Sequence, residues 1–256
     1  MTKNHIIRPY IEHVDLEAIA KSIPYPNETP AGNPGENPPT PRGGASTEPR
    51  SGFVYVPGLN LSFSKERMHM NEDWYKTHKL LQDEKLRMST MKEFNGFLKY
   101  LLDSREEELQ NLYKEITEVR NPWRSNWIDA FFEQKADGLY LNSRHVYSGE
   151  DSEGRICVDA QDKKKLEPCL MTDRGKLINE TQGINLEEWL HNSTSQGLPR
   201  EDISEGELYF WYPRNGSVAW FNANSGRAWL YCGGDPAYHY ASLGVFACAE
   251  GAAPKS

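Results

Sequence analysis

Apolar and polar residues alternate along residues 53–64, FVYVPGLNLSFS. Such alternation sends successive side chains to opposite faces of an extended chain, and this predicts β structure. The Pro57–Gly58 pair in the middle of the stretch is a turn signal. The pattern therefore predicts one strand or two short strands, and we expect order to begin at Phe53.

The spacing of apolar residues becomes helical after this point. Residues 72–84, EDWYKTHKLLQDE, and residues 105–119 both carry apolar side chains that fit one side of a helix. Between them, Thr90-Met91-Lys92-Glu93 has the S/T-x-x-E spacing of a capping box, so a further helix begins there. The apolar stripe of this capped helix is Phe94, Phe97, Leu98, Leu101 and Leu102.

After Asn121-Pro122 the chain reads as short strands separated by turns. A short helix is predicted over 185–191, and the Trp123–Trp127 segment is interpreted as core. Helices followed by strands within about 200 residues favour an α+β domain. The strand-like runs are WIDAFFEQ, GLYLNSRHV, RICVDA, ELYFWYP, VAWFNA, AWLYCG and ASLGVFACA.

The first 52 residues have a different composition. Residues 24–52 are dominated by Pro, Gly, Asn, Glu and Thr, which do not build a core. We therefore expect 1–52 to be a disordered N-terminal arm with a Pro/Gly-rich linker. The folded domain is predicted to span 53–256.

Charge and hydropathy narrow the classes of partner. The formal net charge is −8, which argues against general binding to nucleic-acid backbones. No run of about 18 apolar residues is present, so no membrane insertion is expected. The first residues lack the apolar region of a signal peptide, which favours a cytoplasmic or virion-associated protein.

Catalytic and metal motifs are missing from the sequence. The seven histidines show no H-E-x-x-H or H-x-H spacing, and no Walker, G-x-S-x-G or G-x-G-x-x-G motif is present. His145 and His191 are interpreted as surface or hydrogen-bonded residues without a functional role. The four cysteines, Cys157, Cys169, Cys232 and Cys248, form no C-x-x-C pair, leaving reduced thiols or loop-closing disulfides as alternatives. We predict no enzyme activity, no cofactor and no metal.

The C-terminal segment has an unusual amino-acid composition. From Leu208 to Ala249 there is no Lys, Glu, Gln or Met, while Trp, Tyr, Ser, Gly and Asn are frequent. A buried strand pair would exclude long charged side chains, but many residues here are polar. Rigid aromatics with small polar residues are typical of recognition surfaces. The predicted ligand contacts are Ser217, Ala219, Phe221, Asn222, Asn224, Arg227, Tyr231, Asp235, Tyr238, His239 and Tyr240.

Three short motifs resemble one family. Residues 87–94, RMSTMKEF, resemble the helix start "R-L-P-T-x-x-E-[FW]" of the variable proteins of diversity-generating retroelements. Residues 211–216, WYPRNG, resemble the strand that enters their variable segment, and 241–247, ASLGVFA, resemble the closing "S-x-G-[FV]-R" strand. Phe246 stands where many members have Arg.

The resemblance implies a C-type lectin fold of the formylglycine-generating-enzyme type. It implies two helices flanking a small twisted antiparallel sheet with long loops, and a diversified C-terminal surface that binds a ligand. The family randomises adenines, chiefly in Asn codons, and such changes do not reach Lys, Glu, Gln, Met or Trp. The resemblance thus assigns the fixed scaffold to Trp211, Trp220, Trp229, Cys232 and Gly244.

A protein ligand is the main expectation, and a viral or phage adhesin is one role for it. A carbohydrate-binding lectin is an alternative, although Glu167-Pro168-Cys169 matches the sugar-binding E-P-N motif poorly. A formylglycine-generating type of enzyme is the other, with Cys232 and Cys248 as a cysteine pair.

Overall fold

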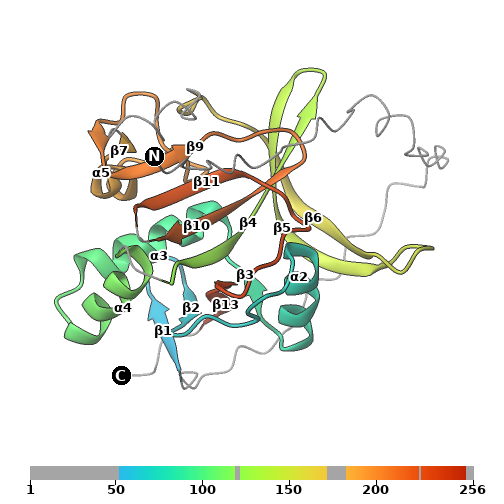
Figure 1. Ribbon diagram of the computed structural model, residues 1–256, viewed down its shortest axis with the longest axis horizontal. Helices are drawn as coiled ribbons and strands as arrows, with labels where there is room; N and C mark the ends of the chain where they lie inside the picture. The colour runs from blue at the N-terminus through green and yellow to red at the C-terminus, as the bar shows by residue number, and fades with distance from the viewer. Residues whose placement is uncertain (1–51, 119–121, 172–182, 225, 252–256) are drawn as a thin grey trace, which may run out of the picture. The chain divides into compact units, whose positions relative to one another are not determined.

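The computed structural model describes residues 52–118, 122–171, 183–224 and 226–251. These residues belong to one compact unit, Gly44–Ser256. The predicted N-terminal arm, 1–52, lies outside the described residues except for Gly52. Figure 1 shows the arrangement of the elements.

A small sheet joins the two ends of the described chain. Its order is β1 (Phe53–Val56), β2 (Leu61–Ser64), β13 (Ala247–Glu250) and β3 (Arg87–Met88). The predicted break at Pro57–Gly58 is confirmed, because it separates β1 from β2, which pair antiparallel. The last strand, β13, pairs antiparallel with β2, so Cys248 lies opposite Phe63.

The larger sheet has the order β6-β5-β4-β10-β11-β9-β7-β8, with β12 attached to β4. The hairpins that join β4 to β5 and β5 to β6 project from the body of the molecule (Figure 1). The strand bounds are β4 (Arg124–Lys135), β5 (Gly138–Glu150), β6 (Ile156–Lys165), β7 (Gly183–Ile184), β8 (Glu205–Gly206), β9 (Leu208–Trp211), β10 (Ser217–Ala223), β11 (Ala228–Gly234) and β12 (Leu243–Gly244).

Mixed α and β structure is what the sequence predicts, but the small antiparallel sheet flanked by two helices is wrong in detail. The described residues form two sheets, and the larger contains two parallel pairs, β11 with β9 and β12 with β4. The parallel pair of β9 and β11 arises because β9 does not pair with β10, the strand that follows it in the sequence. Instead β10 lies between β4 and β11, and β11 then returns beside β9.

Four helices are found among the described residues. They are α2 (Trp74–Asp83), α3 (Met91–Asp103), α4 (Glu107–Thr117) and α5 (Leu186–His191), each within or close to its predicted range. The capping box is confirmed: the Thr90 hydroxyl accepts a hydrogen bond from the Glu93 N–H, and the Glu93 carboxylate accepts one from the Thr90 N–H. The predicted stripe of α3 is buried except for Leu102, which is half-buried.

The main core lies between the large sheet, the small sheet and helices α3, α4 and α5. Phe63 of β2 and Phe97 of α3 stack with ring centroids 4.2 Å apart, and Phe97 also contacts Phe246. Phe246, 2 % exposed, is therefore a core residue. A second cluster packs α2 against the other side of β4, around Trp74 and Trp127.

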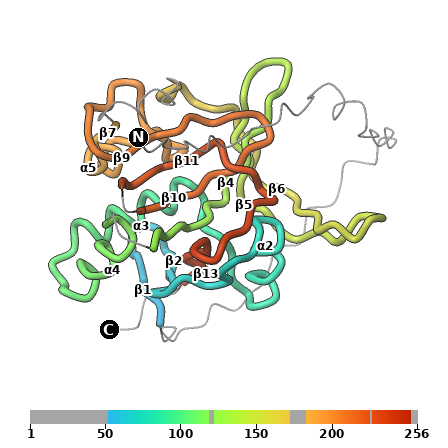
Figure 2. The backbone as a smooth tube through the Cα atoms, viewed as in Figure 1, coloured from blue at the N-terminus to red at the C-terminus, as the bar shows by residue number. Residues whose placement is uncertain are grey.

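The closing segment links the two sheets. The predicted strand at 241–249 is two short strands: β12 runs parallel to β4, and β13 belongs to the small sheet. Figure 2 shows this red segment running from β11 down to β13. At Gly244 a Cβ atom would lie 2.4 Å from the Met70 sulfur and 2.9 Å from the Met68 carbonyl oxygen, so only glycine fits without a shift of backbone.

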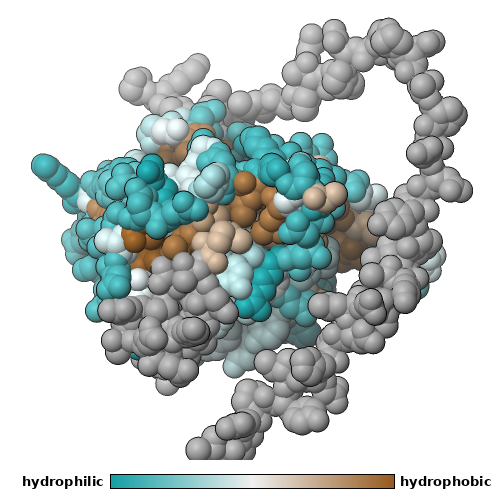
Figure 3. Space-filling model, turned by 90° about the horizontal axis from the view of Figure 1, so that it is seen from above, coloured by the Kyte–Doolittle hydropathy of each residue, from teal (hydrophilic) through white to brown (hydrophobic). Residues whose placement is uncertain are grey.

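The surface is not uniformly polar. Figure 3, seen from above the view of Figure 1, shows a band of hydrophobic residues between hydrophilic ones. Among the described residues no helix combines the length and the apolar composition that crossing a membrane requires. The large hydrophobic side chains that the described surface exposes are Met70, Val146, Met171, Tyr238 and Tyr240.

The start of α3 is held by an ion network around Glu93, which is only 7 % exposed. Arg87 donates two hydrogen bonds to its carboxylate, at 2.7 and 2.9 Å, and Arg144 donates a third at 2.8 Å. Burial alone would raise the pKa of Glu93, but the hydrogen bonds and charge of Arg87 outweigh burial and hold the pKa below its usual value. Ionised Glu93 therefore stabilises the folded state.

We predict that Glu93→Gln lowers the free energy of unfolding at pH 7 by about 3 kcal/mol, because it leaves the Arg87 guanidinium without its anion. The folded-state pKa lies below the unfolded value of about 4.3, so the contribution is complete above that pH and is lost as the pH falls through the folded pKa. Urea unfolding of both proteins between pH 7 and pH 3 measures the difference. Glu107→Gln, at an exposed position of α4, is the control. A difference that stays constant down to pH 3 contradicts the prediction.

Candidate ligand-binding surface

Strands β9, β10 and β11 separate core residues from surface residues by alternation. In β11, Ala228, Leu230 and Cys232 are buried in the main core, whereas Trp229 and Tyr231 are half-buried and point to the other side. The strand register places Trp229 opposite Tyr209 and Tyr231 opposite Trp211 of β9. Aromatic side chains of neighbouring strands are thereby gathered on one side of the sheet.

These rings contact one another in an unbroken series, which we call the aromatic face. From one end to the other it comprises Tyr209, Trp229, Trp211, Tyr231, Trp220, Tyr238, Tyr240 and Trp123. Successive ring centroids lie between 4.7 Å (Trp123 to Tyr240) and 6.4 Å (Tyr238 to Tyr240) apart. Such distances are those of favourable aromatic pairs, so the rings hold each other in place.

The two ends of the aromatic face differ in exposure. Tyr209 is buried, and the guanidinium of Arg227 lies 4.1 Å from the centre of its ring, a cation–π contact. At the other end Tyr238 and Tyr240 are 40 % and 43 % exposed, with His239 exposed between them. The most accessible part of the aromatic face is therefore the turn after β11.

Two predicted contact residues build turns. The Asp235 side chain accepts a hydrogen bond from the Ala237 N–H at 2.9 Å, and its carbonyl oxygen accepts one from the Tyr238 N–H at 3.1 Å. The Asn224 side chain accepts hydrogen bonds from the N–H groups of Gly226 and Arg227. Asp235 and Asn224 therefore position Tyr238 and Arg227 through the backbone.

Three predicted contact residues are wrong, because they lie in the core. Ala219 and Phe221 are fully buried, and Phe221 packs against Phe94 and Trp189. Ser217 is 6 % exposed, and its hydroxyl donates to the Cys232 carbonyl oxygen at 2.7 Å. These residues are two apart on β10, so they share its inner side, and β4 and β11 flank them on both edges.

Asn222 shares the side of Trp220 but is 7 % exposed. It lies between Trp229 on one neighbouring strand and Ser125 on the other. The structure thus joins Tyr238 and His239 in one exposed turn, buries Asn222 beneath the aromatic face, and places Arg227 at its far end. Tyr231 lies near the middle and contacts both Trp211 and Trp220.

Several polar groups in and beneath the aromatic face have no hydrogen-bond partner among the described residues. Among the described residues, the indole N–H groups of Trp220 and Trp229, the Asn222 side-chain oxygen and the Ser125 hydroxyl have no partner. A buried polar group without a partner costs about 1–3 kcal/mol. The aromatic face therefore combines rigid apolar area with donors and acceptors that water or a ligand would satisfy.

Sequence reasoning assigned Trp211, Trp220 and Trp229 to scaffold and Trp123 to core, yet all four are half-buried members of the aromatic face. The sequence signal for the aromatic face was the spacing of these residues along their strands. Trp229 and Tyr231 are two residues apart, as are Tyr209 and Trp211, and residues two apart on a strand share one side of the sheet. The contact between Trp123 and Tyr240 has no such signal, since Tyr240 lies 117 positions after Trp123 along the sequence, roughly half of the chain.

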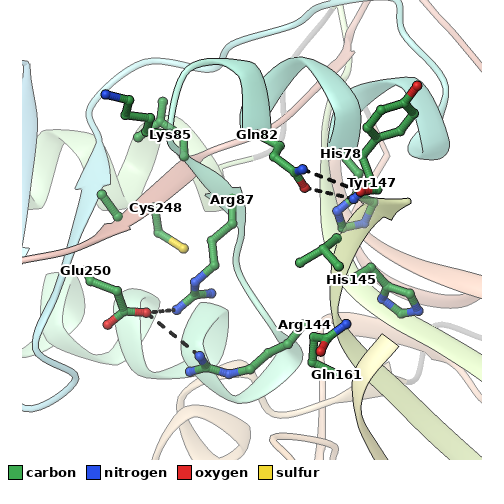
Figure 4. A pocket seen from close by; sticks show the side chains of 13 residues that line it. His78, Gln82, Lys85, Arg87, Arg144, His145, Tyr147, Gln161, Cys248 and Glu250 are labelled. Atoms are coloured by element: carbon green, nitrogen blue, oxygen red, sulfur yellow. Dashed lines mark hydrogen bonds and ion pairs between the residues drawn. The ribbon is translucent and has the colours of Figure 1, made fainter. Parts of the chain in front are cut away.

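A separate cavity of about 490 Å³ lies between α2, β3, β5 and β13 (Figure 4). Arg87 and Arg144 both point toward the carboxylate of Glu250 at its edge. Arg144 and Lys85 adopt positive φ angles, 55° and 60°, a conformation that costs energy in residues other than glycine. The inner wall includes His78 and His145.

A buried carboxylate, Asp129, lies between the two histidines. His145 Nδ1 is 2.5 Å and His78 Nε2 is 3.8 Å from Asp129 Oδ1. The interpretation of His145 as hydrogen-bonded is correct, but it is buried and not on the surface. His78, Asp129 and His145 have no motif spacing, so the sequence contained no signal for this cluster.

The four cysteines are free. Burial raises the pKa of Cys169 to about 12 and raises the pKa values of Cys232 and Cys248 well above the usual range. Buried neutral thiols are poor nucleophiles. Cys157 is exposed.

Comparison of the chain with protein-family models, with curated proteins and with solved structures gives no match.

The neighbouring glycines of β11 provide a test of the aromatic face. A Cβ atom at Gly234 would lie 2.4 Å from the Trp220 ring and 2.9 Å from the Val218 carbonyl oxygen, whereas at Gly233 its nearest contact is 3.7 Å. We predict that Gly234→Ala displaces Trp220 and destabilises the fold by about 1–3 kcal/mol. Gly233→Ala should change stability by less than about 0.5 kcal/mol.

Near-ultraviolet circular dichroism and urea unfolding measure both effects. The aromatic signal should fall in Gly234→Ala and remain in Gly233→Ala. Equal behaviour of the two variants would show that Trp220 is not packed against β11 as described.

Proposed function

We propose that this protein is a ligand-binding display domain that recognises a protein ligand through the aromatic face. The observation that carries the proposal is the continuous series of contacting rings that includes the exposed Tyr238–Tyr240 turn. Aromatic residues provide large contact areas at low cost in side-chain entropy, which is why they dominate binding hot spots. The contacts we propose are Arg227, Tyr231, Tyr238, His239 and Tyr240, with Trp123, Trp211, Trp220 and Trp229 added.

We also propose that the fold is C-type lectin-like and that the chain is a variable protein of a diversity-generating retroelement. Pairing of β13 with β2 supports the fold, because it closes the domain by joining its two ends. The Arg87–Glu93 segment supports the resemblance, because the Arg and the Glu of the motif hydrogen-bond to each other at the start of α3.

Display requires that the backbone tolerate changes in its side chains. The proposed variable positions Tyr238, His239 and Tyr240 lie in an exposed turn and belong to neither core cluster. Two positions proposed as scaffold do not have this tolerance, because Cys232 is buried and Gly244 has no room for a side chain. Substitution in the turn therefore costs little folding free energy.

The double variant Tyr238→Ala/Tyr240→Ala tests the binding role. The probe is a set of peptides selected from a random phage-displayed library on the immobilised full chain. We expect the selected peptides to bind the double variant at least about 10-fold more weakly, which corresponds to about 1.4 kcal/mol, while the unfolding midpoint changes little. Isothermal titration with the synthetic peptides measures the affinity.

Tyr55→Ala is the matched control, because Tyr55 is a half-buried tyrosine on β1 of the small sheet. Its variant should bind the peptides as the parent does. Peptides that lose no affinity for the double variant, or a library that yields no enriched peptide, would contradict the proposal.

A carbohydrate ligand is the second candidate, because stacked rings also suit the apolar faces of sugars. A glycan array probed with and without calcium separates it from the first. Glu167, the acidic residue of the nearest sugar-motif string, accepts a hydrogen bond from the Ser195 N–H at 3.0 Å. The enzyme alternative has less support, since burial raises the thiol pKa of both Cys232 and Cys248.

The retroelement proposal has its own test in the neighbouring DNA. We expect a near-identical repeat of the C-terminal coding stretch, differing at adenines, beside a reverse transcriptase gene. The differences should fall in codons of the exposed turn and spare those of Ala219, Phe221 and Gly244. A locus without such a repeat would remove the diversification system and leave the binding proposal to the peptide experiment.

A further inference from the structure

The buried cluster of His78, Asp129 and His145 contributes its two histidines to the lining of the cavity in Figure 4. One ligand atom from each residue lies within 4.8 Å of the other two. The three residues come from α2, β4 and β5, so three elements converge on one point. All three are buried, with exposed fractions of 3 %, 1 % and 8 %.

One atom in the cluster has no partner. Among the described residues, His78 Nε2 makes no hydrogen bond, although it is buried and faces Asp129 Oδ1 at 3.8 Å. The ring of Trp74 covers both imidazoles, with centroids 4.3 Å from His78 and 4.8 Å from His145. A buried nitrogen facing a carboxylate beyond hydrogen-bonding distance needs a third species to join them.

We propose that His78, Asp129 and His145 form a binding site for a divalent transition-metal ion such as Zn²⁺. Two imidazole nitrogens and one carboxylate oxygen are a ligand set that Zn²⁺ takes in proteins, with a fourth position left for solvent or another ligand. Both histidines line the cavity, which offers room for that fourth ligand.

The surroundings of the cluster support this ligand set. The second oxygen of Asp129 accepts a hydrogen bond from the His145 N–H at 2.9 Å, which fixes the carboxylate as outer-shell partners do at metal sites. Burial lowers the pKa of His78 to about 4, so its imidazole is neutral at pH 7 and has a lone pair available.

Metal binding replaces the hydrogen bond between His145 Nδ1 and Asp129 Oδ1, which lie 2.5 Å apart. The ion takes the place of the proton between these two atoms, and the neutral imidazole carries its single N–H at Nε2 instead, so the exchange needs no net release of a proton. Bonds of about 2.0 Å to both atoms need a wider separation. The two atoms therefore move apart while His78 Nε2 approaches.

Cobalt is the probe, because Co²⁺ replaces Zn²⁺ and has a visible absorption that reports its coordination. The full chain carries Cys157→Ser in all samples, since Cys157 is an exposed thiol that would bind metal by itself. We expect one equivalent of Co²⁺ to give an intense visible band, and Zn²⁺ to abolish it. Zn²⁺ should also raise the unfolding midpoint relative to EDTA.

His78→Gln removes the imidazole nitrogen Nε2. Among the described residues this nitrogen makes no hydrogen bond, so the substitution breaks none at that atom. It should weaken Co²⁺ binding at least about 10-fold. His191→Gln is the matched control: His191 Nε2 also faces a carboxylate, Asp103 at 3.3 Å, but on an exposed surface where the described residues supply no third His, Cys, Asp or Glu ligand. Its variant should bind as the parent does.

Two results would overturn the proposal. One is a parent protein with no visible Co²⁺ band and no shift of its unfolding midpoint with Zn²⁺. The other is a folded His78→Gln variant that keeps the band. If His78→Gln does not fold, the visible Co²⁺ band of the parent protein and the shift of its unfolding midpoint with Zn²⁺ decide between binding and no binding.

Discussion

Alternation along β10 and β11 is the constraint on which the rest of this structure depends. Because successive side chains of a strand point to opposite sides, one residue in two enters the main core and the next is turned outward. Phe221, Leu230 and Cys232 supply the inner side, while Trp220, Trp229 and Tyr231 supply the aromatic face. The same two strands thus stabilise the domain and present its candidate binding surface.

This arrangement explains how a surface rich in tryptophan remains part of a folded domain. Each ring of the aromatic face packs against one or two others, so the rings are rigid before a ligand arrives. Rigid anchors lose little entropy on binding. The Tyr238–Tyr240 turn is the exception, because it is exposed and held chiefly by the Asp235 turn and by ring contacts. It is the part most able to change without cost to the core.

Two buried carboxylates, Glu93 and Asp129, differ in how completely they are hydrogen-bonded. Glu93 is fully bonded by Arg87, Arg144 and the Thr90 N–H, so it stabilises the start of α3. Asp129 is bonded by His145, but His78 faces it without a hydrogen bond. The bonded carboxylate of Glu93 fits a structural role. The cluster of His78, Asp129 and His145, in which one nitrogen lacks a hydrogen bond, is where a metal ion is proposed.

The sequence by itself determined the local elements. The break at Pro57–Gly58, the capping box at Thr90 and the helical stripes are short-range signals, and the structure contains each of them. The amino-acid composition of the C-terminal segment also indicated that the candidate surface lies there. It did not separate Phe221 from Trp220, since that needs the side of β10 that faces the core.

Only the tertiary structure decided strand order, the parallel pairing of β9 with β11, and which rings meet. Trp123 contacts Tyr240, and His78 and His145 meet at Asp129, across separations that no local pattern encodes. Local signals depend on hydrogen bonds and propensities within a few residues. These distant contacts depend instead on how whole sheets and helices bury their apolar sides together, a property of the assembled chain.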